Sequence, residues 1–293
     1  MSFRTVVVRK RSKIETRLDY LVVRGETENL IHINEIGTLI VETPAVAITG
    51  QALMILSRNN VNVVFCDDKH SPFAQLHTMY GNHATSGKIR QQSNWTVEDK
   101  NNVWQKIIEQ KIYWQSKVLV KYNQNEAATL LQSYIFDVKP NDTSNREGHA
   151  AKVYFNALFG MGFTRRTDNT INYMLNYGYS MILSSVSREI VAAGYVTQLG
   201  IHHRSEGNQF NLSCDIMEPF RPFVDAYVLM IEGNDDFKNL ITQILSTKVV
   251  IGGKEFFLDA GIRRYVREVL DCMNGECEMP KIEKFILGEE NEL

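Results

Sequence analysis

The stretch NTINYMLNYGYSMILSSVSREIVAA, residues 169–193, decides the fold more than any other part of the chain. One side of it carries apolar residues and a glycine at helical spacing: Ile171, Met174, Leu175, Gly178, Ile182, Val186 and Ile190. Residues that recur at this period predict one long helix, from about Asn169 to Ala193. We therefore place the stretch in a helical domain.

Several other segments after residue 94 have the same period. The first starts near Asn94 and has one apolar face, formed by Trp104, Ile108, Ile112 and Leu119. Further helices are expected from near Ser144 and over Glu126–Tyr134, Asp215–Ile231, Asp235–Leu245 and Leu258–Met273. We therefore expect residues 95–293 to form an all-helical domain that carries the chemistry.

The first 80 residues have a different pattern, with short runs rich in valine and isoleucine between turn-like residues. These runs predict strands at Thr5–Val8, Tyr20–Val23, Leu30–Ile33, Thr38–Val41, Ala45–Ile48 and Val61–Cys66. One short helix, from Thr49 to about Arg58 with Thr49 as its N-cap, is expected between them. Residues 81–94 are polar and resemble a linker. The predicted class is α+β, with a small β-rich domain at residues 1–80.

Composition and charge limit the possible functions. The chain has 293 residues, of which 44% are hydrophobic and 23% charged, so a packed globular protein is expected. The formal net charge is -2, whereas proteins that coat nucleic acid through bulk charge are strongly basic. Any contact with DNA must therefore come from local patches. No apolar run approaches the roughly 18 residues of a membrane span, and no signal peptide is evident, so we expect a cytoplasmic location.

The cysteines suggest ordinary thiols. The chain has Cys66, Cys214, Cys272 and Cys277, and none of them forms a C-x-x-C pair. Reduced thiols in a cytosolic protein are the expected reading. Cys272 and Cys277 as half of a zinc site remain an alternative, although no second half is evident.

Glu147 has two possible roles. Its spacing from Ser144 is that of a capping box, in which a serine and a glutamate satisfy open backbone donors at a helix start. Against this, Glu147 shares a helix face with Ala150, Tyr154 and Leu158. A carboxylate above an apolar face is costly unless a cation or hydrogen-bond donors compensate it, and a metal ion is one such cation.

The segment from Gly200 to Pro222 contains the other candidate ligands. Two adjacent histidines, His202 and His203, precede a loop and then an acidic helix start. Asp215 and Glu218 are three residues apart and therefore share a face of that helix. Taken alone, such residues are most often favourable charges near a helix N-terminus.

Three motifs in this order resemble the CRISPR-associated adaptation integrases, the Cas1 family. They are NREGHAAKVYF at residues 145–155, NYMLNYGY at residues 172–179 and the Gly200–Pro222 stretch, which ends in DIMEPFRP. The segments INEIGTLIV at residues 33–41 and VVFCD at residues 63–67 are similar to the N-terminal strands of the family. The resemblance covers nearly the whole chain, and its wording is most similar to members from type II systems.

The resemblance implies a β-rich domain that forms a homodimer and a helical catalytic domain. By position, the family's metal ligands and catalytic residues correspond to Glu147, His203 and Glu218. His203 rather than His202 holds the fourth position of the glycine-led motif, and Glu218 stands where many members have aspartate. Asp215 takes the family's neighbouring acidic position. Arg221, one turn after Glu218, either orients that carboxylate or the reacting phosphate, or pairs with Asp225.

Two carboxylates and one imidazole suit Mg²⁺ or Mn²⁺ better than a structural zinc. The implied activity is that of a metal-dependent DNA endonuclease and integrase of CRISPR adaptation. It would insert short foreign fragments, the spacers, into a repeat array by attack of a 3′-hydroxyl on a target phosphodiester. One phosphodiester replaces another in this reaction, so no nucleotide triphosphate is needed. That agrees with the lack of a G-x-x-x-x-G-K-[ST] loop in the sequence.

The remaining expectations concern DNA and partner proteins. The candidate phosphate contacts are Lys88, Arg90, Lys106, Lys117, Lys121, Arg165, Arg166, Arg263, Arg264 and Arg267. The resemblance implies a heterohexamer with the small Cas2 protein, and further type II adaptation proteins and the effector nuclease as partners. Two other readings stay open, namely a nuclease selective for branched DNA and a DNA-binding scaffold without catalysis.

Overall fold

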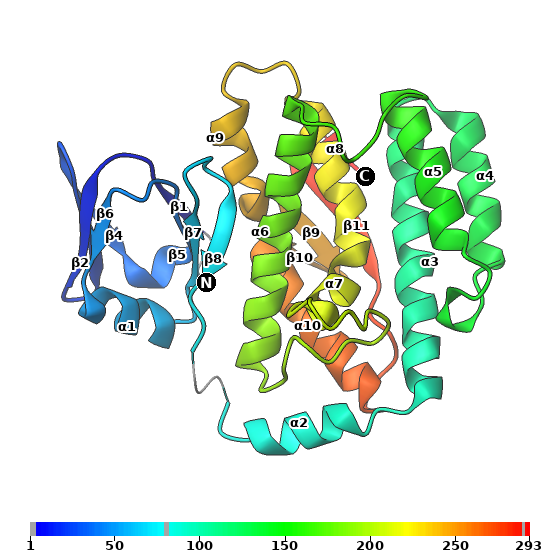
Figure 1. Cartoon of the computed structure of the whole chain (residues 1–293), viewed down its shortest axis with the longest axis horizontal. Helices are drawn as coiled ribbons and strands as arrows, with labels where there is room; N and C mark the ends of the chain where they lie inside the picture. Colours follow the sequence, from blue (N-terminus) through cyan, green and yellow to red (C-terminus); the bar gives the residue numbers. More distant parts are fainter. Residues whose placement is uncertain (1–3, 79–81, 289–290) are drawn as a thin grey trace.

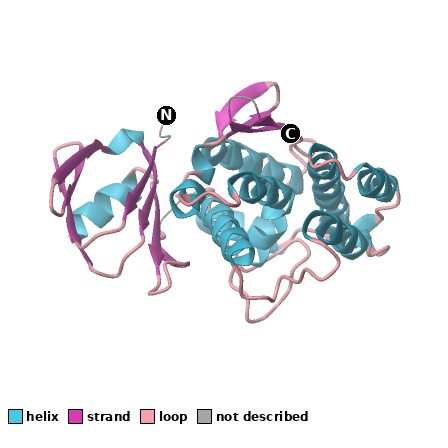
Figure 2. Ribbon diagram, turned by 90° about the horizontal axis from the view of Figure 1, so that it is seen from above, coloured by secondary structure: helices cyan, strands magenta, loops and turns pink. Residues whose placement is uncertain are grey.

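The computed structural model describes residues 4–78, 82–288 and 291–293. Its N-terminal part consists of two four-stranded sheets with helix α1 (Gly50–Arg58) between them (Figure 2). The first sheet has the order β1 (Arg4–Val8), β5 (Ile36–Val41), β7 (Asn62–Cys66) and β8 (Pro72–Gln75). The second has the order β4 (Glu28–His32), β3 (Tyr20–Arg24), β2 (Ser12–Arg17) and β6 (Val46–Ile48). Buried aliphatic side chains from both sheets and from α1 form one core.

Most of the N-terminal prediction is confirmed. The six expected strands are present, and the side chain of Thr49 caps α1 by accepting a hydrogen bond from the backbone N–H of Ala52. Strand β2 was not predicted, because it is polar apart from Ile14, its one fully buried residue. Strand β8 was not predicted either, since Pro72 and its polar neighbours are typical of a loop.

The predicted linker contains regular structure. Residues 81–94 include helix α2 (Thr85–Ser93), although residue 81 lies outside the described residues. The buried side chain of Gln92 ties α2 to the C-terminal part, because its amide donates to the carbonyls of Val196 and Leu199 and accepts from the N–H of Val196. These contacts with a distant loop cannot be read from a local polar pattern. The domain boundaries themselves stay a prediction.

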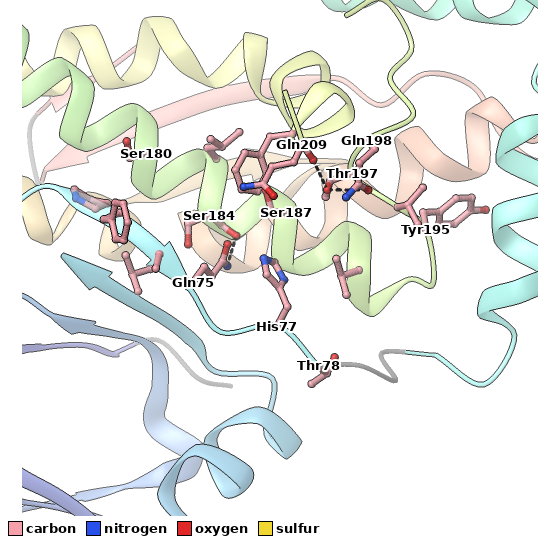
Figure 3. A pocket seen from close by; sticks show the side chains of 18 of the residues that line it. Gln75, His77, Thr78, Ser180, Ser184, Ser187, Tyr195, Thr197, Gln198 and Gln209 are labelled. Atoms are coloured by element: carbon pink, nitrogen blue, oxygen red, sulfur yellow. Dashed lines mark hydrogen bonds between the residues drawn. The ribbon is translucent and has the colours of Figure 1, made fainter. Parts of the chain in front are cut away.

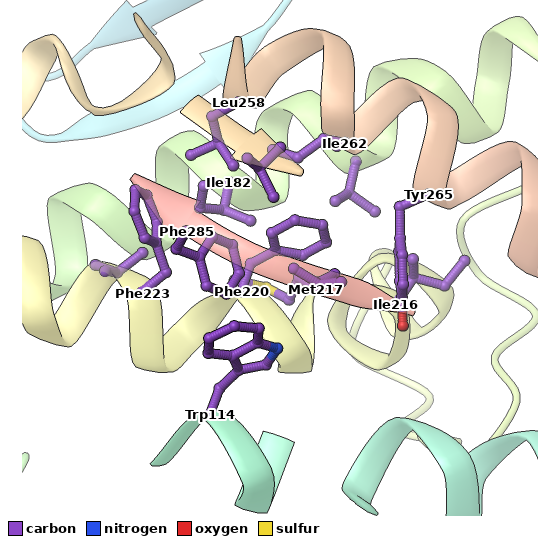
Figure 4. Packing of buried hydrophobic residues seen from close by; sticks show 14 of the residues in the cluster. Trp114, Ile182, Ile216, Met217, Phe220, Phe223, Leu258, Ile262, Tyr265 and Phe285 are labelled. Carbon is purple, nitrogen blue, oxygen red and sulfur yellow. The ribbon is translucent and has the colours of Figure 1, made fainter. Parts of the chain in front are cut away.

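The C-terminal part is organised around α6 (Thr170–Ala192), as the opening stretch predicts. Figure 1 shows α6 between the first sheet on one side and most of the other helices on the opposite side. Those helices are α3 (Val97–Lys121), α4 (Asn125–Phe136), α5 (Arg146–Phe159), α7 (Asn211–Met217), α8 (Arg221–Ile231) and α10 (Leu258–Met273). Helix α9 (Phe237–Thr242) contacts α6 and lies beside its upper end in this view. In the core, Trp114 of α3 packs against the ring of Phe285, which stacks on Phe223 (Figure 4).

The expected α+β class is confirmed, but the C-terminal part is not entirely helical. A small sheet has the order β10 (Lys254–Phe257), β9 (Lys248–Ile251), β11 (Ile282–Gly288) and β12 (Asn291–Glu292). Gly252 and Gly253 have positive φ angles and form the turn between β9 and β10. Such a glycine pair between apolar runs is a hairpin signal. Within the described ranges, no helix combines the length and hydropathy needed to cross a bilayer.

The helix expected over Asp215–Ile231 is interrupted in a way that matters for the site. A 3-10 turn at Glu218–Phe220 separates α7 from α8. Pro219 and Pro222 lack a backbone N–H, so neither can donate in a regular helical ladder. The break lets Glu218 turn toward α3, with which this turn is in contact.

Candidate functional site

Glu147 is the first of the predicted ligands along the chain, and it does not cap its own helix. Helix α5 starts at Arg146, and its N-terminal donors are satisfied by Asp142, whose two carboxylate oxygens accept from the N–H groups of Arg146 and Glu147. Ser144 donates instead to the carbonyl of Asp137. The capping-box alternative for Glu147 is therefore wrong. The carboxylate of Glu147 points away from its own helix start, toward α3.

Glu218 supplies a second carboxylate, which is 4% exposed. Arg221 donates from Nε to Oε1 of Glu218 over 2.7 Å, so Arg221 orients Glu218 rather than pairing with Asp225. Burial alone would raise the pKa of Glu218, but the charges of Arg221 and Lys111 outweigh it and lower the pKa to about 2. Glu218 is therefore ionised at any physiological pH.

Lys111 lies between these carboxylates, and it was not among the predicted site residues. Its Nζ is 2.6 Å from Oε1 of Glu147 and 2.5 Å from Oε2 of Glu218. Burial lowers the pKa of Lys111, but the two glutamates more than compensate, so the pKa is raised and the side chain is charged. A signal was present, because Lys111 is three residues after Ile108 and seven after Trp104, within the apolar face of α3.

His203 is held in a fixed orientation by Asp215. The Nδ1 of His203 donates to Oδ1 of Asp215 over 2.6 Å, and this hydrogen bond raises the pKa of the imidazole. Asp215 is fully buried and also accepts from the backbone N–H groups of Ile201, His202 and His203. With Nδ1 engaged, Nε2 of His203 is the nitrogen left to bind a ligand.

His202 has a different environment from its neighbour. Its ring stacks on Trp104 of α3 with a centroid distance of 4.3 Å and an interplanar angle of 3°. Its Nδ1 lies 2.9 Å from the side-chain oxygen of Asn141, and burial lowers the pKa of His202. Trp104 also meets the edge of His203 at 5.8 Å. Helix α3 thus contacts the two histidines through Trp104 and the two glutamates through Lys111.

The donor chemistry of this site fits a divalent cation, but the geometry is not that of a finished metal centre. Among the described residues, no three His, Cys, Asp or Glu side chains gather closely enough to hold a metal ion. Glu147 and Glu218 nevertheless converge on one positive charge, the ammonium of Lys111. Two oxygen donors and an imidazole would suit Mg²⁺ or Mn²⁺ at this position.

A cavity of about 220 Å³ adjoins Glu218. Its cations are Lys111, Arg165 and Arg221, and both arginines lie over the ring of Tyr179, at 5.2 and 4.7 Å from its centroid. Asp225 accepts a short hydrogen bond from the hydroxyl of Tyr179, and burial raises the pKa of Asp225 to about 6. The cavity therefore places the carboxylate of Glu218 beside a cluster of positive charge, which would suit a phosphate group.

The other candidate phosphate contacts are spread over the molecule. Lys106, Arg263 and Arg264 have intramolecular ion pairs, with Glu109, Glu189 and Glu268. Lys88 lies over the ring of Tyr195, and Lys117 lies over that of Tyr113. Arg90, Arg166 and Arg267 are exposed, and Lys121 is partly buried. Their role toward DNA stays a prediction, and Arg165 is the candidate that the structure places beside the site.

A larger cavity lies elsewhere. It has a volume of about 670 Å³ and is situated between β8 and α6 (Figure 3). Its polar groups are mostly uncharged, with Gln75 bonded to the carbonyl of Ser184 and Thr197 bonded to the carbonyl of Gln209. Among the described residues that line this cavity there is no carboxylate, lysine or arginine, so its chemistry differs from that of the candidate site.

Comparison with known proteins gives a consistent result. Residues 5–240 match the family model described as "CRISPR associated protein Cas1". The CRISPR-associated endonuclease Cas1 of Neisseria meningitidis serogroup C (strain 8013) is 32% identical over 230 residues, which make up 78% of this chain and 76% of that protein.

A casposase bound to integration product shares the fold with a TM-score of 0.75, 21% identity, and coverage of 96% of this chain and 93% of that one. A Cas6-RT-Cas1–Cas2 complex does so with a TM-score of 0.69, 16% identity, and coverage of 93% and 35%.

Proposed function

The chain belongs to the Cas1 family, and on that premise we propose that it is a divalent-metal-dependent DNA integrase and endonuclease of CRISPR adaptation. The Neisseria relative is named an endonuclease, and the casposase is described with an integration product. These names support a nuclease or integrase acting on DNA. The proposal adds metal dependence and the insertion of spacers into a repeat array.

One observation carries the proposal. Carboxylates from two separate segments, Glu147 at the start of α5 and Glu218 between α7 and α8, meet at a single buried cation. His203 contacts Trp104 of the same helix, α3. Its ring is oriented by Asp215, which leaves Nε2 available to bind a metal ion. Two carboxylates that meet at one site, one of them buried and the other partly buried, are a weak source of stability, so the arrangement is best explained by catalysis.

The site residues would have different roles in the proposed reaction. Glu147, Glu218 and His203 would hold the ion, which supplies charge neutralisation at the reacting phosphate. Arg221 keeps Glu218 ionised and, with Arg165, offers guanidinium groups to a phosphate in the adjoining cavity. The 3′-hydroxyl of the incoming fragment forms a new P–O bond as the target's P–O bond breaks. The proton lost by the attacking hydroxyl balances the one taken up by the departing 3′-oxygen.

The proposed partners extend beyond DNA. We propose a homodimer that joins Cas2 in a heterohexamer, because one structural relative is a complex of Cas1 with Cas2. The resemblance to type II members adds their further adaptation proteins and the effector nuclease to the proposed partners. A cytoplasmic location is part of the same proposal.

A strand-transfer assay tests the function. A short duplex with free 3′-hydroxyls is incubated with a supercoiled plasmid that carries a repeat, with Cas2 and Mg²⁺ or Mn²⁺. We expect covalently joined products from the wild type and none from Glu147→Gln or His203→Gln. Glu126→Gln, which changes an exposed glutamate in the first turn of α4, serves as the matched control.

The products also separate the alternatives. Cleaved fragments without joined strands would indicate a nuclease alone, and DNA binding that survives chelation with no product would indicate a scaffold. Joining by Glu147→Gln at the wild-type rate would show that the proposed site is wrong.

A further inference from the structure

The ammonium of Lys111 occupies the space that the proposed function gives to a metal ion. Lys111 is 8% exposed, and its Nζ lies within 2.6 Å of a carboxylate oxygen on each side. A charged amine at such depth is unusual unless it is needed to compensate other charges.

The two carboxylates depend on this lysine to different extents. Glu218 also has the guanidinium of Arg221, which would compensate its charge alone. For Glu147, the ammonium of Lys111 is the ion-pair partner that the described part of the chain provides. Without Lys111 or another cation, the partly buried carboxylate of Glu147 would stay unpaired.

A metal ion and this ammonium cannot both hold the same carboxylates. Divalent ions such as Mg²⁺ bind carboxylate oxygens at about 2.0–2.1 Å. An ion between Glu147 and Glu218 would therefore lie almost in contact with Nζ of Lys111, and the two positive charges would repel each other strongly. One of the two cations must leave.

We propose that Lys111 is an internal counterion, which holds Glu147 and Glu218 together in the metal-free protein and leaves them when a divalent ion binds. The proposal rests on the proposed function, since it concerns the same site. It also accounts for the lack of a ready-made ligand cluster among the described residues.

The structure offers a position for the displaced ammonium. Gln115 lies one turn further along α3, is 2% exposed and lines the 220 Å³ cavity together with Lys111. Its side-chain Oε1 is buried and has no hydrogen-bond partner among the described residues. An unsatisfied buried acceptor is costly, and an ammonium that swings toward it would satisfy it.

This movement has a consequence for DNA. In the cavity, the ammonium of Lys111 would join the guanidinium groups of Arg165 and Arg221. Positive charge would thus accumulate where a phosphate binds at the moment when a metal ion neutralises the glutamates. Lys111 would be a positioning residue for both carboxylates and phosphate.

Direct titration with Mn²⁺ tests the exchange. The electron paramagnetic resonance signal of free Mn²⁺ reports the dissociation constant of the full-length protein without DNA. We expect Lys111→Met, which has no charge to displace, to bind Mn²⁺ about tenfold more tightly than the wild type. Gln115→Met, which removes the acceptor for the displaced ammonium, should bind it more weakly. Lys152→Met, an exposed position on α5, the helix that carries Glu147, should bind as the wild type does.

The controls separate this proposal from the metal site itself. Equal or weaker binding by Lys111→Met would overturn the counterion role. If that variant does not fold by circular dichroism, unchanged binding by Gln115→Met would overturn it instead. The metal site is tested by Glu218→Ala, which should abolish the high-affinity binding. Binding that survives Glu218→Ala would contradict the proposed function, whatever Lys111→Met shows.

Discussion

At the scale of single residues, the geometry of the site depends on Asp215. Its carboxylate accepts four hydrogen bonds, three from consecutive backbone N–H groups and one from the ring of His203. Carboxylates of this kind fix the orientation of a ligating imidazole and raise its basicity. Asp215 therefore links the shape of the loop at residues 201–203 to the chemistry of the imidazole.

The first prediction concerns this carboxylate. Asp215→Asn replaces one of the two carboxylate oxygens by an NH2 group, which cannot accept a hydrogen bond. Depending on the amide orientation, the variant loses the hydrogen bonds from the N–H groups of Ile201 and His202, or the one from the ring of His203. We expect the strand-transfer rate to fall about 10- to 100-fold, with partial recovery at high Mn²⁺. Glu206→Gln, in the exposed loop that follows, is the control. An unchanged rate in Asp215→Asn would contradict the role of Asp215.

A second prediction concerns pH and Asp225. Burial raises the pKa of Asp225 from 3.8 to about 6, so the folded state binds this proton more tightly than the unfolded chain. The contribution of Asp225 to the free energy of unfolding therefore falls as pH rises from about 4 to about 6. The free energy of unfolding of Asp225→Asn, measured relative to that of the wild type, should therefore increase by on the order of 3 kcal/mol between pH 4 and pH 7.

Urea denaturation at a series of pH values measures this difference. Asp19→Asn, at an exposed position in a turn, should have no comparable pH dependence. A constant difference in stability between Asp225→Asn and the wild type over this range would show that the pKa of Asp225 is not raised.

At the scale of elements, α6 and α8 approach each other unusually closely. A Cβ added at Gly178 of α6 would lie 2.5 Å from Cγ1 of Val224 of α8. Helix α8 begins at Arg221, directly after the turn that carries Glu218, so its position sets that of the carboxylate. The glycine in the opening stretch of the sequence is therefore a packing residue.

Gly178→Ala should test this contact. We expect a loss of about 1–3 kcal/mol in the free energy of unfolding, because the methyl group overpacks the interface. Strand transfer should fall as α8 moves. Gly207→Ala, where a Cβ meets nothing within 4 Å, is the matched control and should stay within about 1 kcal/mol of the wild type. Equal stability of the two variants would contradict the close approach.

Elements with strong periodicity were predictable, and those determined by distant contacts were not. The helix at Leu258–Met273 has the predicted bounds, and α6 is shorter than predicted by one residue at each end. The break at Glu218–Phe220 was missed, although the prolines at 219 and 222 are its physical cause. Helix α2 depends on hydrogen bonds of Gln92 to residues more than a hundred positions away.

The candidate site was predictable in part. The helix face of Glu147 is otherwise apolar, which made this carboxylate unusual, and the family resemblance indicated His203 and Glu218. Residue spacing alone did not indicate which cation lies between the two glutamates. Lys111 lies on the same helix as Lys106, Lys117 and Lys121, which the sequence suggested as phosphate contacts, but Lys111 was not singled out with them. Its position on the apolar face of α3 was a local signal of burial, but its place between the two glutamates follows from the packing of α3 against α5 and α8.

At the scale of the whole molecule, a buried ionic network joins the two parts of the chain. Arg188 of α6 contacts Asp259 of α10 and donates to the carbonyl of Gly37 in β5. The adjacent Glu189 is fully buried and accepts from Asn60, just after the end of α1, and from Arg188. The β-rich part is thereby fastened to the helix that supports the site.

Glu189→Gln should weaken this junction. Removal of one charge from a buried network leaves Arg188 incompletely paired, so we expect a loss of about 3 kcal/mol in the free energy of unfolding. Glu268→Gln breaks a partly exposed pair with Arg264 and should cost less than about 1 kcal/mol. Similar losses in both variants, measured by urea denaturation, would contradict the role of the network.

The central claim is that Glu147, His203 and Glu218 share one divalent ion. Anomalous diffraction from crystals of the full chain soaked in Mn²⁺ tests it most directly. We predict one peak in contact with carboxylate oxygens of both glutamates and with Nε2 of His203. A protein that joins DNA in Mn²⁺ but has its peak at other residues, with Lys111 still between the two glutamates, would contradict the account.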